Sequence, residues 1–240
     1  MRTTHLGKNS KKINKKGIDL LDVIERSFSN AKFGIDIWNV YDFMYLDKKN
    51  IPLLKVLEIS IPSSSKYLIE SKSMKLYLND FYNKSFKNKY DVIDTIKNDL
   101  SNSIGCKVKT KFVERFSGEP KFSSLNSFSL KKTKPNNIYK FNGFRSICPV
   151  TSQPDFANIY IYSDSQINTK WLLDYLISFK DHGGFHEQCI DLIYNEIQKK
   201  YNVDNLEICG RFQRRGGIDI NPIRGNQKKV LFSNFREFNQ

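Results

Sequence analysis

A thiol and a carboxylate stand seven residues apart on a loop that prolines stiffen. The loop is the segment C-P-V-T-S-Q-P-D, which runs from Cys148 to Asp155. A thiolate is the reactive form of cysteine, and a nearby carboxylate can take up or return a proton, although its charge raises a thiol pKa. The pair fits addition of a thiol to an electrophile, coupled to proton transfer. The alternative is a buried cysteine that packs as a small apolar group, with an aspartate that caps a turn.

The residues that follow this loop indicate what holds it. From Asn158 to Tyr162, polar or amphipathic side chains alternate with aliphatic ones. A period of two is typical of a half-buried β-strand. We expect such a strand to keep the thiol and the carboxylate in register.

The segment E-S-K-S-M-K-L-Y, from Glu70 to Tyr77, brings a second carboxylate to the start of an expected helix. A ligand there could meet the carboxylate, the free N–H groups of the first turn, and the ammonium groups of Lys72 and Lys75. The alternative is that Glu70 only caps an amphipathic helix.

A glycine pair precedes the segment F-H-E-Q-C, in which His186 and Glu187 lie at another expected helix start. Both side chains could face a ligand. A zinc site of His186 and Cys189 is the alternative, but no C-x-x-C or H-E-x-x-H pattern supplies further ligands.

The segment R-R-G-G-I-D-I-N-P-I-R places adjacent arginines before two glycines. Guanidinium groups and bare backbone amides can approach one anion there, which suggests phosphate recognition. A hairpin with solvated arginines is the alternative. The arginines of this cluster are Arg211, Arg214, Arg215 and Arg224.

Composition bounds the class of protein. The chain has 240 residues, of which 39% are hydrophobic and 27% charged, as in globular proteins of one or two domains. We expect a cytoplasmic protein without a membrane span, because no apolar stretch reaches about 18 residues and no apolar run follows the basic N-terminus. The four cysteines are expected to be reduced thiols. The net charge of +14 comes mainly from scattered lysines, which indicate a solvated surface better than a nucleic-acid site.

The order of elements repeats along the chain. We expect a basic lead (1–35), a first module (36–116), a linker (117–137) and a second module (138–240). Each half reads as strands, two helices and strands, which favours an α+β fold with antiparallel sheets. No G-x-G-x-x-G follows a strand, so a dinucleotide would not bind in the usual way. The expected helices are 18–26, 73–85, 91–101 with Asp91 as cap and Gly105 as stop, 169–179 and 186–201; the expected strands are 53–61, 106–115, 158–162 and 206–214.

Taken in this order, the four motifs closely resemble the NADPH-dependent 7-cyano-7-deazaguanine reductase family of the two-module type, from about Trp38 to Arg224. The hallmark is E-S-K-S-x-K-L-Y, and C-P-x-T-x-Q-P-D, F-H-E-Q-C and R-R-G-G-x-D-I-N-P-x-R also match. The chain departs from the resemblance in a shorter N-terminus and in Lys-rich loops. The resemblance implies two tandem tunnelling-fold modules, each an antiparallel sheet with two helices packed on one face. It also implies that no metal is used, unlike in the zinc enzymes GTP cyclohydrolase I and pyruvoyl-tetrahydropterin synthase of the same fold.

The resemblance also implies a reaction. Cys148 would attack the nitrile carbon of 7-cyano-7-deazaguanine, and Asp155 would protonate the nitrile nitrogen as a covalent thioimidate forms. Covalent capture splits a four-electron reduction into two hydride transfers from NADPH, which give the primary amine. His186 is the expected proton source for the second reduction.

Residues for binding follow from the same resemblance. Glu70 and Glu187 would accept hydrogen bonds from the guanine-like edge. Because the hallmark segment and the thiol loop lie in different halves, we expect the site where the modules meet, within or between subunits of a homodimer. The remaining substrate contacts would be Ile69, Ser71 and His186, and the NADPH contacts Ser71, Lys72, Arg215 and Gly216.

Two rival functions come from other classes. One is a zinc-dependent pterin or purine enzyme of the same fold, and the other is a basic tRNA-binding protein. The product of the reductase family is a precursor of the tRNA nucleoside queuosine. The reductase acts on the free base, so we expect no direct contact with nucleic acid.

Overall fold

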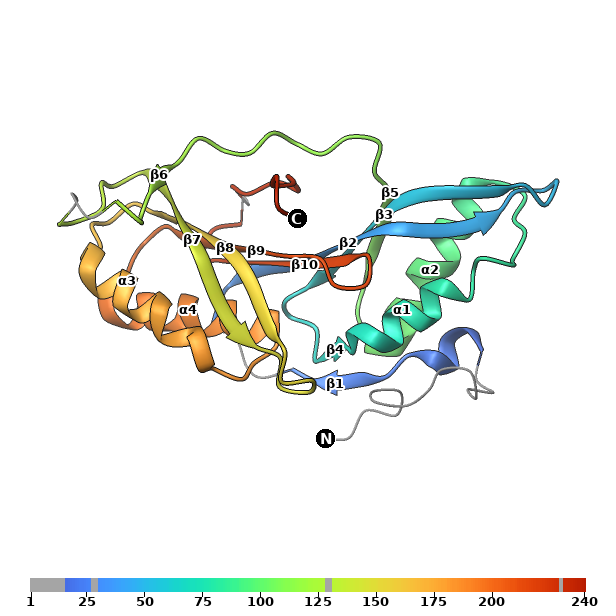
Figure 1. Cartoon of the computed structure of the whole chain (residues 1–240), viewed down its shortest axis with the longest axis horizontal. Helices are drawn as coiled ribbons and strands as arrows, with labels where there is room; N and C mark the ends of the chain where they lie inside the picture. Colours follow the sequence, from blue (N-terminus) through green and yellow to red (C-terminus); the bar gives the residue numbers. More distant parts are fainter. Residues whose placement is uncertain (1–15, 27–29, 128–130, 229–230) are drawn as a thin grey trace. The chain divides into compact units, whose positions relative to one another are not determined.

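The computed structural model describes residues 16–26, 30–127, 131–228 and 231–240. Contacts divide the described chain into two compact units, and each unit contains two α-helices and an antiparallel sheet, which confirms the predicted α+β class (Figure 1). No helix among these residues is both long and apolar enough to cross a membrane.

The first unit contains residues 16–26, 38–114 and 215–218. Its sheet has the order β5–β3–β2, and β3 pairs antiparallel with β5. A separate pair of strands, β1 and β4, is also antiparallel, and β4 ends directly before α1. The junction of β4 and α1 therefore carries the hallmark segment. The elements are β1 (Val23–Glu25), β2 (Phe33–Leu46), β3 (Pro52–Pro62), β4 (Tyr67–Ile69), α1 (Ser71–Asn79), α2 (Lys89–Ile104) and β5 (Lys109–Phe112).

Several boundaries in this unit differ from the prediction, beginning with the first expected helix. The predicted helix over 18–26 is a short 3₁₀-helix, Gly17–Leu20, followed by β1. The backbone of Asp22 cannot continue a helix, because its N–H donates to Ser73 Oγ at 3.0 Å and its carbonyl accepts from the Glu70 N–H at 2.9 Å.

The bounds of the first α-helix and the cap of the second differ from the prediction. The helix predicted over 73–85 begins at Ser71 and ends at Asn79, because Glu70 caps it. The cap of α2 is Asn88, whose side chain accepts from the N–H groups of Tyr90 and Asp91, and not Asp91 itself. The predicted stop at Gly105 is confirmed.

The second unit contains residues 30–37, 115–214 and 219–240, apart from the undescribed positions. Its strands have the order β10–β9–β8–β7–β6, antiparallel except for the short β6–β7 pair. Helices α3 and α4 pack on one face of this sheet (Figure 1), and α4 has the predicted bounds. The elements are β6 (Ser123–Ser124), β7 (Asn137–Ile147), β8 (Pro154–Ser163), α3 (Thr169–Ser178), α4 (His186–Tyr201), β9 (Leu206–Phe212) and β10 (Ile218–Gly225).

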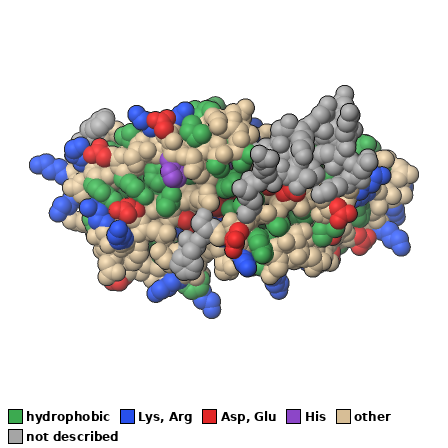
Figure 2. All heavy atoms as spheres, turned by 90° about the horizontal axis from the view of Figure 1, so that it is seen from below, with side chains coloured by type: hydrophobic (Ala, Val, Ile, Leu, Met, Phe, Trp, Pro, Cys, Tyr) green, Lys and Arg blue, Asp and Glu red, His purple; other side chains and the backbone are tan. Residues whose placement is uncertain are grey.

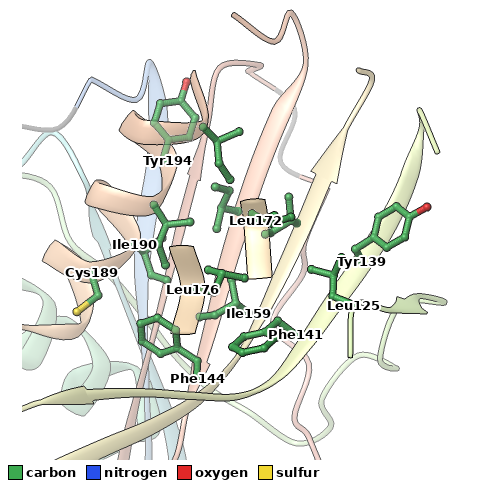
Figure 3. Packing of buried hydrophobic residues seen from close by; sticks show 14 of the residues in the cluster. Leu125, Tyr139, Phe141, Phe144, Ile159, Leu172, Leu176, Cys189, Ile190 and Tyr194 are labelled. Atoms are coloured by element: carbon green, nitrogen blue, oxygen red, sulfur yellow. The ribbon is translucent and has the colours of Figure 1, made fainter. Parts of the chain in front are cut away.

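Strand β8 is buried on both faces, which corrects the prediction of a half-buried strand. Ile159 and Ile161 face the core under α3 and α4, where Figure 3 shows Ile159 beside Leu176. Tyr160 faces the opposite way, into a second cluster that includes Phe235. The predicted alternation of side chains between the two faces is confirmed. A distant segment, residues 231–240, however covers the face that was expected to be solvated.

Polar contacts hold this segment to the sheet. Glu207 accepts hydrogen bonds from the N–H groups of Leu231 and Phe232, both at 2.7 Å. Glu237, which is buried, accepts from Asn158 Nδ2 at 2.8 Å and from the Tyr160 hydroxyl. The second face of the sheet is therefore closed by hydrogen bonds as well as by apolar packing.

Candidate active site

The thiol loop closes on itself between β7 and β8. The Cys148 N–H donates to the Gln153 carbonyl at 2.9 Å, and the Ser152 N–H donates to the Cys148 carbonyl at 3.0 Å. The two strands pair with Ser146 opposite Asp155. This register brings the carboxylate beside the strand end that carries the thiol.

The end of β7 is also tied to the glycine pair before α4. The Ile147 N–H donates to the His182 carbonyl at 2.8 Å, and the Gly184 N–H donates to the Ile147 carbonyl at 3.1 Å. The start of α4 is then fixed by the Phe185 N–H, which donates to Gln188 Oε1 at 3.0 Å. The thiol loop and the F-H-E-Q-C segment therefore meet in this unit.

The loop lowers the pKa of the half-buried Cys148 thiol. Burial acts to raise this pKa, but hydrogen bonds from the Thr151 hydroxyl and from the N–H groups of Thr151 and Val150 favour the thiolate and outweigh it. The charge of Asp155 raises the pKa, as predicted, yet it is the smallest of these influences. Sequence reasoning missed Thr151, because only the folded loop directs its donors at the sulfur.

His186 lies between Asp155 and an aromatic ring. Its Nε2 is 3.4 Å from Asp155 Oδ2, and the two side chains are 12% and 4% exposed. Its imidazole ring stacks on the ring of Phe212, with centroids 3.9 Å apart and planes 8° from parallel. Sequence reasoning did not identify Phe212, which looks like an ordinary strand residue in an apolar position. The structure thus brings three predicted residues, Cys148, Asp155 and His186, into one site.

The neighbouring Cys189 lies in a different environment from Cys148. It is fully buried, with Sγ 3.9 Å from the Gly184 carbonyl, and Figure 3 shows its sulfur pointing away from the labelled core side chains. Burial raises its pKa to about 12, so it stays a thiol at neutral pH. Across the described ranges, no group of three or more His, Cys, Asp or Glu side chains could hold a metal ion. The zinc alternative gains no support there.

Glu187 lies in the first turn of α4 and is 4% exposed. In the first unit, Glu70 is equally buried and caps α1, accepting from the Lys72 N–H at 2.9 Å and the Ser73 N–H at 2.7 Å. The capping alternative therefore describes Glu70 correctly. It does not exclude binding, because a carboxylate has about four lone-pair sites and the cap uses two. Ser71, the first residue of α1, is exposed.

The Arg215–Ile218 segment of the first unit forms a tight hairpin turn. The Arg215 N–H donates to the Ile218 carbonyl at 2.8 Å, and the Ile218 N–H donates back at 3.2 Å. Gly216 and Gly217 have φ of 58° and 80°, the left-handed values that a type I′ turn requires. The hairpin alternative is therefore correct for the backbone, while the Arg215 side chain remains exposed.

Asp42 links this turn to the hallmark helix. A Cβ atom at Gly217 would lie 2.6 Å from Asp42 Oδ1, so the turn approaches this carboxylate as only glycine permits. The Tyr41 N–H also donates to the Gly217 carbonyl at 2.9 Å. On its other side, Asp42 forms an ion pair with Lys75 of α1. Sequence reasoning missed Asp42, which lies outside all four motifs.

Two of the four arginines expected to bind phosphate are structural instead. Arg224 is fully buried and pairs with Asp191 and with Asp36, the latter at 2.8 Å. Arg211 is 1% exposed, donates to the Ser233 carbonyl, and lies 3.9 Å from the Phe235 ring centroid. Spacing alone could not show that these strand residues face inward.

Comparisons with known proteins place these features in one family. The family model described as "Nitrile reductase, 7-cyano-7-deazaguanine-reductase N-term" matches residues 4–112, and that described as "QueF-like protein" matches residues 154–230. The chain is 37% identical to the NADPH-dependent 7-cyano-7-deazaguanine reductase of Buchnera aphidicola, over 80% of this chain and 82% of the relative. It is 33% identical to the Polaromonas protein of that name, over 97% and 96% of the two chains. It is 37% identical to the Desulfotalea psychrophila protein, over 80% and 78%.

Proposed function

The chain belongs to the NADPH-dependent 7-cyano-7-deazaguanine reductase family, and from this membership we propose how its own residues carry out the reaction. The protein reduces the nitrile of 7-cyano-7-deazaguanine to an aminomethyl group, which yields a precursor of queuosine. Two hydrides and two protons convert the carbon–nitrogen triple bond into CH₂–NH₂, and two NADPH become two NADP⁺. The observation that carries the proposed mechanism is the Cys148 thiol, whose pKa the loop lowers beside the buried Asp155.

The first step is covalent capture. The Cys148 sulfur forms a bond to the nitrile carbon, and one π-electron pair of the carbon–nitrogen bond moves to nitrogen. Asp155 takes the proton that the thiol loses as the thiolate forms and passes it to that nitrogen, and the product is a thioimidate. The donors of Thr151 and Val150 support this role, because they stabilise the thiolate that attacks.

His186 supplies the next proton. Its Nε2 faces the Asp155 carboxylate at 3.4 Å, so a proton can pass between them during the second reduction. Because Asp155 and His186 are both largely shielded, few waters compete for that proton.

Two buried carboxylates recognise the base. Glu70 and Glu187 accept hydrogen bonds from the N–H groups of the guanine-like edge, with Ile69, Ser71 and His186 around it. The cap fixes the Glu70 carboxylate before any ligand arrives, which supports this assignment. A base without those N–H groups would not form these hydrogen bonds, which disfavours its binding.

NADPH supplies hydride when it is bound. The described residues fit this reactant, because nothing lies within 4 Å of the position that a Cβ would take at Gly216, so the backbone of the turn is open to approach. The exposed Arg215 guanidinium can bind a phosphate in two parallel hydrogen bonds. Ser71 and Lys72 lie in the first turn of α1, where the helix dipole favours an anion.

An intact-mass experiment tests the covalent step. Native protein and a Cys148→Ala variant are incubated with 7-cyano-7-deazaguanine in the absence of NADPH. We expect the native chain to gain one substrate mass and the variant to gain none. A folded, reduced native protein that gains no mass would overturn the thioimidate mechanism.

Two statements about partners complete the proposal. The protein is a homodimer, and analytical ultracentrifugation that finds an active monomer would overturn this. It acts on the free base without binding tRNA; on the face that Figure 2 shows, Lys and Arg side chains are scattered and form no single patch. Salt-sensitive tRNA binding at physiological ionic strength would contradict that statement.

A further inference from the structure

The orientation of His186 needs an explanation, because hydrogen bonds do not fix it. A histidine ring is usually held by a hydrogen bond to one of its nitrogens. Within the part of the chain that the structure describes, His186 Nδ1 is buried and has no hydrogen-bond partner. Nε2 faces Asp155 at 3.4 Å, which is longer than a good hydrogen bond. Packing must therefore hold the ring.

Phe212 provides that packing. Its fully buried ring lies parallel to the imidazole, with centroids 3.9 Å apart, and covers one face of it. A stacked ring resists the side-chain rotation that would turn Nε2 away from Asp155. The contact thus constrains the one torsion that the missing hydrogen bond would otherwise fix.

The sequence makes room for this ring at Gly210, two residues earlier on the same face of β9. A Cβ atom at Gly210 would lie 2.9 Å from Phe212 Cε2 and 2.8 Å from Ile190 Cδ1. Any larger residue there must displace the Phe212 ring or the side chain of Ile190 on α4. Glycine at this position is therefore required by the ring's location and not by the backbone torsion.

Phe212 is itself held from two other sides. The ring of Phe144 meets it edge-on, at 6.1 Å between centroids and 87° between planes. The backbone carbonyl of Phe212 accepts a hydrogen bond from Gln240 Nε2 at 3.0 Å. The ring is thus a fixed support, whose position does not depend on His186.

We propose that Phe212 is a positioning residue that holds the His186 imidazole with Nε2 toward Asp155, in place of a hydrogen bond to Nδ1. The consequence for catalysis rests on the proposed function, in which His186 passes a proton to Asp155. Without the ring, the imidazole rotates and proton delivery in the second reduction slows. Binding of NADPH does not depend on this ring, because His186 is not among the proposed NADPH contacts.

Nuclear magnetic resonance tests the positioning directly. The chain has three histidines, so their imidazole signals can be assigned by single replacement. We expect the His186 ring protons of the native protein to resonate upfield because of the stacked Phe212 ring, and Phe212→Leu to abolish that displacement. Phe141→Leu, which removes a ring from the same core, should leave it in place. A His186 signal that is the same in the native protein and in Phe212→Leu would overturn the proposal.

Kinetics test the consequence for catalysis. Phe212→Leu should lower kcat about 10- to 100-fold, the range for a misplaced acid–base group, with the KM for NADPH within about twofold. Phe212→Tyr, which keeps the ring, should restore most of kcat, and Gly210→Ala should lower it. An equal loss of kcat in Phe141→Leu would show a general core defect and overturn the kinetic part. If the native protein formed no covalent adduct with the nitrile, the proposed function would be wrong. The nuclear magnetic resonance experiment would still decide the role of Phe212.

Discussion

The carboxylate of Asp42 occupies the space that any side chain at position 217 would need. Glycine at this position therefore lets the turn that carries Arg215 approach strand β2. The same carboxylate pairs with Lys75 of the hallmark helix. Two segments that are far apart in the sequence thus meet through a residue that belongs to neither.

Replacing Gly217 by alanine should separate the turn from Asp42. The left-handed backbone alone costs about 1–2 kcal/mol for a residue other than glycine. The clash adds about 1–3 kcal/mol, and we expect the KM for NADPH to rise because the turn moves. Gly216→Ala is the matched control for stability, since its φ is also positive but nothing lies within 4 Å of its Cβ position. Equal losses of unfolding free energy in the two variants, measured by urea denaturation, would show that the Asp42 contact is unimportant.

Two substitutions in the thiol loop should move the pKa of Cys148 in opposite directions. Thr151→Val removes the hydroxyl hydrogen bond that favours the thiolate, so the pKa should rise. Asp155→Asn removes a negative charge that opposes the thiolate, so the pKa should fall. The measurement is the rate of alkylation at Cys148 as a function of pH, followed by peptide mass spectrometry. Thr151→Ser keeps the hydroxyl and should behave as the native protein does. If both substitutions moved the pKa of Cys148 in the same direction, the electrostatic explanation would be wrong.

Replacing Arg224 by methionine should lower stability, whereas replacing Arg215 by methionine should raise the KM for NADPH. Arg224→Met leaves Asp36 and Asp191 buried without their cation, so we expect a loss of about 3–5 kcal/mol in unfolding free energy. Arg215→Met affects an exposed side chain, so stability should change by less than about 0.5 kcal/mol while the KM for NADPH rises at least about tenfold. Denaturation and steady-state kinetics on both variants decide between these roles. A large loss of stability in Arg215→Met would count against its assignment to NADPH.

The capping and binding roles of Glu70 can be separated by side-chain length. Glu70→Ala should cost about 0.5–2 kcal/mol in stability, because the N–H groups of Lys72 and Ser73 lose their acceptor. Glu70→Asp still caps the helix but withdraws the carboxylate from a ligand, so stability should hold while the KM for the nitrile rises at least about tenfold. If Glu70→Asp binds the substrate normally, Glu70 serves only as a cap.

The features that sequence reasoning predicted well are those encoded locally. Helix α4 has its predicted bounds, because a glycine pair, the Gln188 contact to the helix start and a regular apolar period all lie within the segment itself. The pairing of Cys148 with Asp155 was also accessible, since one hairpin register places both. What local sequence encodes, local sequence can predict.

The features that it missed depend on partners far along the chain. Strand β10 has polar Asp219, Asn221 and Arg224, yet all are buried, and Arg224 pairs with Asp36 across 188 residues. No sequence pattern within β10 predicts such a partner. Phe212 was missed for a related reason, since an aromatic strand residue signals burial and does not reveal which side chain it will touch.

The covering of β8 by residues 231–240 sets an order of events during synthesis. Asn158 and its partner Glu237 are 79 residues apart. At about 5–20 residues per second, a ribosome needs roughly 4–16 seconds to make the residues between them. Throughout that interval the strand that carries Asp155 has one face without its cover. Helices α3 and α4 are made within the interval and can cover the other face before residues 231–240 exist. The nascent chain therefore carries this strand of the thiol hairpin with one face uncovered until residues 231–240 are made, and this delay is when chaperones would matter most.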